Sequence, residues 1–187
     1  MQIVKKMVIW LGVVILILLG IGFLLPSRWV VKREIVIQAS PATIYPFIAN
    51  FEDGWSQWSA FDDEDPDIRY TYSGPDIGVG AKRAWTSSIM GDGWQVITSA
   101  DVDAGVEFDL VMIKYDSYVK GRITTEKTDE GATRVTWVDS GNVGQNLFKR
   151  YLGLFMDRML GNAFETSLTN LKAKAEATAG APQQPQQ

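Results

Sequence analysis

The feature that most constrains this chain is an uncharged apolar run near its N-terminus. From Met7 to Leu25 the sequence reads MVIWLGVVILILLGIGFLL, without a charged side chain. At a rise of about 1.5 Å per residue, a helix of this length is just long enough to cross a hydrocarbon core about 30 Å thick. The run therefore predicts a transmembrane anchor within residues 1–27, followed by a separate folded part.

A cleavable signal peptide is the alternative interpretation, because Lys5 and Lys6 precede the run. The run exceeds the usual apolar region of a signal peptide, about 7 to 15 residues, and the LLPSRWVV that ends it offers no small residues spaced for cleavage. We therefore favour an uncleaved, single-pass anchor in the cell membrane. Basic residues flank the run on both sides, so their count does not decide the orientation of the anchor in the membrane. We expect the short N-terminal end to stay in the cytoplasm, which places the folded domain on the extracytoplasmic side.

Composition excludes several classes of function. The chain has no histidine and no cysteine, which removes the commonest general base, the Ser-His-Asp arrangement, thiol nucleophiles and the usual transition-metal ligands. Two of the 18 basic residues precede the apolar run, whereas all 22 acidic residues follow it, so the folded part is acidic. Such a domain is not attracted to phosphate backbones, and no nucleic acid is expected as a partner. No catalytic residue, metal ligand or cofactor is predicted.

The remaining residues predict an α+β domain. A β-branched run at 30–38 is typical of a strand, and Ser40 with Pro41 begins a helix that extends to about Phe51. Glycine- and aspartate-rich turns separate six further strand-like segments, at 67–72, 81–87, 93–103, 106–114, 118–127 and 133–139. Six consecutive strands indicate an antiparallel meander. The last residues, 178–187, have the composition of a disordered tail.

A long amphipathic helix is predicted from about Gln145 to Ala177, because apolar residues recur there at spacings of mostly three and four. The stripe consists of Phe148, Leu152, Phe155, Met159, Ala163, Leu168, Leu171 and Ala175. Gly153 and Gly161 lie within the helix, and each costs about 1 kcal/mol relative to alanine. Either the helix bends at these glycines or another group approaches its backbone closely.

An acid-rich stretch, WSQWSAFDDEDPD at 55–67, suggests several functions. Aromatic side chains beside paired carboxylates are typical of glycoside hydrolases, and a dense acidic cluster can hold calcium. The EF-hand order of ligands is absent, and the stretch connects a helix to a strand. We therefore favour two tryptophans that close one end of the core, with the acids in a solvated loop.

Several stretches carry a resemblance to a known family: IVIQASPATIYPFIANF, W-x-x-W before an acidic DP, YSGPDIGVGAKRAW, GDGWQVIT, TRVTW and GLFMDRMLGNAFETSLTNLKA. Together with the order of elements, they resemble the START-related SRPBCC superfamily, and specifically its membrane-anchored, polyketide cyclase/dehydrase-like branch. The resemblance covers residues 28–177. It implies the helix-grip fold, in which a seven-stranded antiparallel curved sheet wraps around the long C-terminal helix and encloses an apolar cavity.

Strand alternation then indicates which side chains line that cavity. Phe108, Leu110 and Met112 share one face of their strand, Val135 and Trp137 share one face of theirs, and Arg83 lies on the same face as Trp85, where it places a cation at the wall or rim. The predicted ligand-binding residues are Arg83, Trp85, Phe108, Leu110, Met112, Val135, Trp137, Phe155 and Met159.

The predicted function is a membrane-anchored binding protein for a hydrophobic small molecule or lipid. An enzyme with cyclase- or hydrolase-like activity in the same cavity is one alternative, but Glu107 and Asp109 face away from Phe108 and no catalytic arrangement is legible. A regulatory partner of another membrane complex is the second alternative.

Overall fold

The computed structural model describes residues 2–63 and 65–180. Its elements, in chain order, are α1 (Gln2–Leu24), β1 (Arg28–Ile37), α2 (Pro41–Ala49), η1 (Trp55–Gln57), η2 (Ala60–Asp63), β2 (Arg69–Ser73), β3 (Lys82–Thr86), β4 (Gly93–Asp101), β5 (Gly105–Met112), η3 (Ile113–Tyr115), β6 (Ser117–Lys127), β7 (Thr133–Asn142), α3 (Leu147–Gly153) and α4 (Met156–Gly180). Of the predicted tail, residues 178–180 continue α4 and residues 181–187 lie outside the described part.

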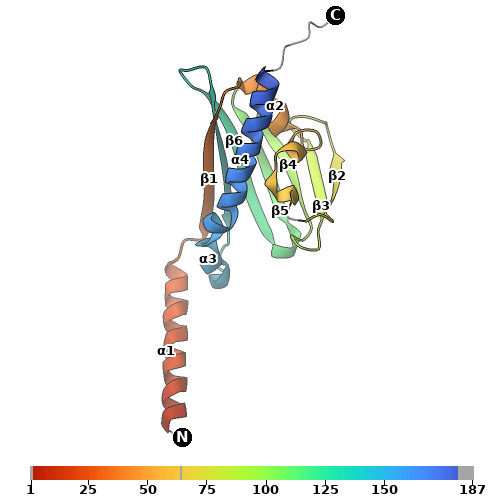
Figure 1. The fold of residues 1–187 in the computed structure, drawn as a ribbon. Coiled ribbons are helices and arrows are strands. Elements are labelled where there is room, and N and C mark those ends of the chain that lie inside the picture. The colour runs from red at the N-terminus through yellow and green to blue at the C-terminus, as the bar shows by residue number, and fades with distance from the viewer. Residues whose placement is uncertain (1, 64, 181–187) are drawn as a thin grey trace, which may run out of the picture.

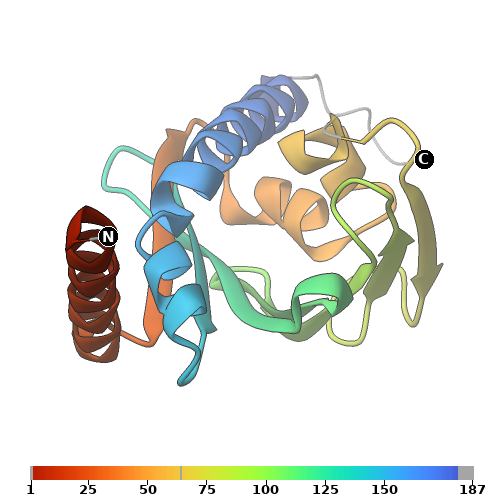
Figure 2. The same ribbon diagram turned by 90° about the horizontal axis from the view of Figure 1, so that it is seen from below.

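The strands form one antiparallel sheet, as predicted. Their order is β1-β7-β6-β5-β4-β3-β2, so β2 to β7 make a meander and β1 pairs with the last strand of it. The sheet curves, and α2 and α4 lie on its inner side, with α4 running along β1 (Figures 1 and 2). The predicted helix-grip architecture of the domain is confirmed.

Helix α1 is, within residues 2–63 and 65–180, the one helix long and apolar enough to cross a membrane. Its residues are exposed except Gly22, and it projects from the domain below α3 (Figure 1). The predicted N-terminal apolar helix is therefore present.

The long C-terminal helix is broken in two, which corrects the prediction of a single helix from Gln145 to Ala177. The chain turns at Leu154 and Phe155, whose backbone N–H groups donate to Tyr151 O and Leu152 O. Beyond the turn, α4 buries Phe164, Leu168, Leu171 and Ala175 against the sheet. The first half of the apolar stripe belongs to α3, the turn and the first turn of α4, and the sheet does not cover it.

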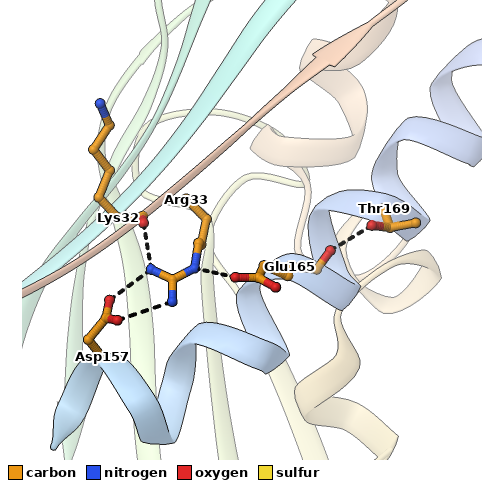
Figure 3. Close-up of polar contacts among 5 residues, drawn as sticks. All are labelled: Lys32, Arg33, Asp157, Glu165 and Thr169. Carbon is orange, nitrogen blue, oxygen red and sulfur yellow. Dashed lines mark hydrogen bonds and ion pairs between the residues drawn. The ribbon is translucent and has the colours of Figure 1, made fainter.

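Gly161 allows a close approach to the helix backbone. Arg33 of β1 lies beneath it, and a Cβ at Gly161 would collide with the guanidinium. The Arg33 guanidinium donates to Glu165 Oε1 at 2.6 Å and to Asp157 Oδ1 at 2.7 Å, which fixes α4 on β1 (Figure 3). The hydrogen bond to Asp157, followed in size by the one to Glu165, raises the pKa of the Arg33 guanidinium. The hydrogen bond between Arg33 and Asp157 also holds the pKa of the Asp157 carboxyl below its ordinary value.

Three glycines of the sheet make room for aromatic rings. Trp85 pairs with Gly93, Phe108 with Gly121 and Trp29 with Gly141, each across neighbouring strands. At each glycine, an added Cβ would overlap the ring of its cross-strand partner. Glycine in a strand commonly marks such a close approach, so these three pairs determine how the inner layer of the sheet packs.

We expect Gly121→Ala to lower the free energy of unfolding by about 1–3 kcal/mol, because the added methyl group forces the buried Phe108 ring out of position. Urea unfolding of the full chain in detergent, followed by circular dichroism, measures the change. Gly153→Ala is the matched control. Its Cβ meets only Trp29 at 3.9 Å, so it should be neutral or stabilising by up to about 1 kcal/mol. Equal losses in the two variants would contradict this packing.

Candidate functional site

The candidate site lies on the inner face of the sheet, along one row of side chains that crosses the strands. The register places Tyr72, Arg83, Gln95 and Leu110 side by side on β2, β3, β4 and β5. The same row continues through β6 and β7 to Trp29, the second residue of β1. The row therefore connects the far edge of the sheet with the point where α1 enters the domain.

Arg83 is the central charged group of the row. The residue is only 6% exposed. Its Nε donates to Gln95 Oε1 at 3.0 Å, and its Nη1 lies 3.8 Å from Asp62 Oδ1. The guanidinium carbon lies 4.9 to 5.9 Å from four ring centroids, those of Trp55, Phe51, Tyr70 and Trp85. A guanidinium surrounded by ring faces at such distances gains cation–π attraction.

Burial changes the proton affinities around Arg83. Desolvation lowers the pKa of the guanidinium, while Asp62 acts in the opposite direction. The Tyr70 hydroxyl donates to Asp62 Oδ1 at 2.7 Å, and desolvation raises the pKa of this phenol above its ordinary value, against the effect of Arg83. The raised pKa keeps Tyr70 a neutral donor at physiological pH, and the guanidinium of Arg83 is a cation because arginine does not lose its proton in proteins.

Gln95 supplies a second donor to the row. Its side chain is completely buried, and its Nε2 has no hydrogen-bond partner among the described residues. Its Oε1 accepts from Arg83, which fixes the orientation of the amide and leaves the Nε2–H groups as donors. A buried donor without an acceptor costs about 1–3 kcal/mol, so an acceptor atom of a ligand would find a favourable place beside Gln95.

Apolar side chains adjoin these donors. Leu110, paired with Gln95, is half-buried, and so is Met112, which pairs with Gly93 next to Trp85. Met156 and Leu160 at the start of α4 are also half-buried and pack against the core. The inner face thus combines a cation and an amide donor with an apolar surface that is only partly covered.

The structure divides the predicted site residues into three groups. Arg83, Trp85, Leu110 and Met112 belong to the row just described or to the adjoining one. Phe108, Val135 and Trp137 lie deeper, each at most 2% exposed, in the packed core. Phe155, in the turn between α3 and α4, and Met159, in the first turn of α4, are 55% and 59% exposed and lie outside the packed core.

Sequence reasoning missed Gln95 as a site residue. A signal for it was present, because alternation in GWQVIT puts Gln95 on the same face as Ile97, and a polar residue on an inner face is informative. Asp139 was missed as well. It is 6% exposed, its Oδ1 accepts from Trp137 Nε1 at 2.9 Å, and desolvation raises the pKa of its carboxyl to about 7 against the effect of that hydrogen bond.

The acid-rich loop is more ordered than a solvated loop. Trp55 and Trp58 are buried, as expected, but Asp65 is buried too, and it accepts from the Ser87 hydroxyl and from Asp67 N. Asp62 accepts from Tyr70. Among the described residues, which omit Glu64, no group of three or more acids is arranged to hold a metal ion. Two of the loop acids are therefore hydrogen-bond acceptors for neighbouring elements.

Two surface depressions lie elsewhere. The larger, about 390 Å³, is on the outer face of the sheet, where Glu107, Asp109, Lys120 and Arg122 form a mixed-charge lining. The smaller, about 260 Å³, adjoins the turn of residues 87–92. Neither depression is lined by Arg83, Gln95 or α4, so neither corresponds to the cavity that the resemblance implies.

Comparison with known proteins gives both a family and a fold. A family model described as "Polyketide cyclase / dehydrase and lipid transport" matches residues 28–176. A protein of unknown function from Staphylococcus aureus superposes with a TM-score of 0.62 at 13% identity, covering 82% of this chain and 97% of that chain. The di-domain ARO/CYC StfQ from the steffimycin biosynthetic pathway gives 0.61 at 10% identity, covering 83% of this chain and 53% of that chain.

Ara h 8.0201 gives a TM-score of 0.53 at 12% identity, covering 82% of this chain and 99% of that chain. At such identities, the likeness to these structures shows a shared fold alone. No curated protein matches the sequence.

Proposed function

This chain belongs to the polyketide cyclase / dehydrase and lipid transport family, and from this membership we propose that its domain binds a hydrophobic molecule beside a membrane. The family match and the shared fold confirm the resemblance to the SRPBCC helix-grip superfamily. The ligand that we propose has an apolar body and a hydrogen-bond acceptor, such as a carboxylate, at one end. It lies between the sheet and α4, with its acceptor at Arg83 and Gln95.

The observation that carries this proposal is the pair of buried donors beside a partly covered apolar surface. Arg83 and the Gln95 amide both point their N–H groups to the inner side of the sheet, and Leu110 lies next in the same row. A buried donor without a partner costs free energy, whereas an anionic acceptor at this position gains a charge-assisted hydrogen bond from Arg83.

The membrane location rests on α1, whose length and composition suit a single span. The chain between the end of α1 and the start of β1 is only three residues, 25–27. Since an extended chain covers at most about 3.6 Å per residue, the domain cannot move far from the surface that holds α1. A ligand of low solubility would then exchange with the adjoining lipid.

We expect Arg83→Met to weaken the binding of oleate about 10- to 100-fold and not to weaken the binding of oleylamine, because the guanidinium repels the ammonium group of oleylamine. Methionine keeps much of the apolar volume but removes the charge, and a hydrogen bond to a charged group contributes about 1.5–3 kcal/mol. Native mass spectrometry of the full chain, released from nanodiscs with each ligand, measures both affinities.

Arg122→Met is the matched control, because Arg122 lies on the outer face of the sheet. It should bind oleate like the unaltered chain. If Arg83→Met and Arg122→Met bound oleate equally well, or if Arg83→Met weakened oleate and oleylamine alike, the proposed position of the acceptor would be wrong.

A further inference from the structure

Helix α3 is docked on the end of α1. The Tyr151 hydroxyl donates to Leu18 O, and Arg150 Nη1 donates to Phe23 O at 3.0 Å and to Leu25 O at 3.2 Å. Gly22 is the one buried position of α1, where Leu147 and Tyr151 pack against it. Arg150 thus places its charge at the C-terminal carbonyls of α1, where a cation is stabilising.

These contacts fix the depth of α3 relative to the span. Leu18 lies six residues before the last residue of α1, which corresponds to about 9 Å along the helix axis. Tyr151 therefore reaches beside the final turns of α1, before the point where that helix ends. If α1 crosses a membrane, then α3 lies at the boundary between headgroups and hydrocarbon, where tyrosine is enriched.

At this level the domain exposes large apolar side chains on η3, on α3, on the turn after α3 and on the first turn of α4. Their exposed fractions range from 43% at Leu152 to 79% at Phe148. We name this surface the apolar rim, and it consists of Ile113, Phe148, Leu152, Leu154, Phe155 and Met159. Lys149 Nζ joins α3 to η3 by donating to Tyr115 O at 3.0 Å, so the rim is one continuous structure.

We propose that the apolar rim inserts into the surface of the bilayer that α1 spans, so that the inner face of the sheet opens toward lipid. The inference rests on the membrane anchor of the proposed function. Exposed apolar residues on such a scale mark an interaction surface, and α1, packed against the same helix, identifies the bilayer as the partner. Along α4 the rim is followed by Met156 and Leu160, which are half-buried and pack against the core.

The absence of cysteine makes a direct test possible, because one introduced cysteine is then the single labelling site. We would prepare Phe155→Cys, Val14→Cys and Lys174→Cys in the full chain, attach a nitroxide spin label, and reconstitute each into phosphatidylcholine–phosphatidylglycerol vesicles. Val14 lies in the middle of α1, whereas Lys174 is exposed and lies 18 residues beyond Met156 on α4, about 27 Å away. Accessibility to oxygen relative to a water-soluble nickel complex reports depth.

The ratio of oxygen accessibility to nickel accessibility should be several-fold higher for the label at residue 155 than for the label at residue 174. It should approach the ratio measured at residue 14. Phe148→Cys, at the other end of α3, should give the same result and guards against a local effect of one substitution. If the label at residue 14 lies in lipid while the labels at residues 155 and 148 are both exposed to water, the proposed insertion of the rim is wrong and the anchor stands.

An aqueous label at residue 14 would refute the anchor itself, and with it both the rim proposal and the membrane part of the proposed function. Spin–spin broadening at residue 155 would show that the rim contacts a second copy of the chain, and would also overturn the inference. Oleate binding is measured separately, so its loss in the Arg83→Met variant stays independent of every outcome here.

Discussion

Asp139→Asn is expected to raise the free energy of unfolding at pH 8 by about 1–3 kcal/mol and to lower it by up to about 2 kcal/mol at pH 4, where Asp139 is protonated and the cost of the buried amide remains. Desolvation raises the pKa of the Asp139 carboxyl from 3.8 to about 7, and Trp137 Nε1 is its hydrogen-bond donor. A difference of about 3 units corresponds to about 4 kcal/mol for ionising the buried group. Asparagine avoids this penalty, but burying its amide N–H groups without an acceptor costs about 1–3 kcal/mol, which offsets part of the stabilisation.

The direction of the pH dependence follows from the raised pKa. Between about pH 4 and pH 7 the folded chain holds a proton on Asp139 that the unfolded chain has released, so this residue makes stability fall as the pH rises. Above pH 7 both states are ionised, and the penalty is constant. In Asp139→Asn this slope should disappear.

Urea unfolding of the full chain in detergent at pH 4, 6 and 8 measures the slope. Asp129→Asn is the control, because Asp129 is exposed in the turn between β6 and β7. It removes the same charge and should leave the pH dependence as it is. A slope that persists in Asp139→Asn would mean that another buried group controls it.

The elements of the fold could be predicted from local patterns. β-branched runs, punctuated by glycine and aspartate, gave all seven strands, and Ser40 with Pro41 gave the start of α2, where the Ser40 hydroxyl accepts from Thr43 N. These signals act within a few residues along the chain, so no knowledge of tertiary contacts was needed.

The break between α3 and α4 could not be predicted in the same way. Phe148, Leu152, Phe155 and Met159 have helical spacing whether they face a sheet or a different surface, and periodicity does not say which partner covers a stripe. In the structure, α3 packs beside α1 rather than against the sheet, because the side chains of Tyr151 and Arg150 donate hydrogen bonds to backbone carbonyls of α1. A contact between residues 18 and 151 leaves no mark in either local sequence.

The candidate site shows the same limit. Strand alternation correctly put Arg83 and Trp85 on one face. The role of Arg83 in the candidate site, however, depends on its hydrogen bond to Gln95, its partner in the register of β3 and β4. Register is set by the whole sheet, so the pairing of a cation with a buried amide appears only once the strands are aligned.

Trp55→Ala should cost about 3–5 kcal/mol of stability, because Trp55 occupies the centre of the aromatic core. Its ring lies 4.7 Å from that of Trp58 and 5.5 Å from those of Phe108 and Trp137, measured between centroids. Its Nε1 donates to Ile48 O at 2.8 Å, and alanine leaves that buried carbonyl without its donor. Urea unfolding followed by circular dichroism measures the loss.

Trp94→Ala is the matched control, since Trp94 is half-buried on the opposite face of the sheet, with Lys82 above its ring. We expect it to cost at most about 1–2 kcal/mol. Added indole should restore part of the stability lost by Trp55→Ala but not by Trp94→Ala, because a dry apolar void binds a ligand of matching shape. If Trp55→Ala instead costs no more than Trp94→Ala, the space around Trp55 is already hydrated. The proposed ligand cavity would then extend from Arg83 into the region around Trp55.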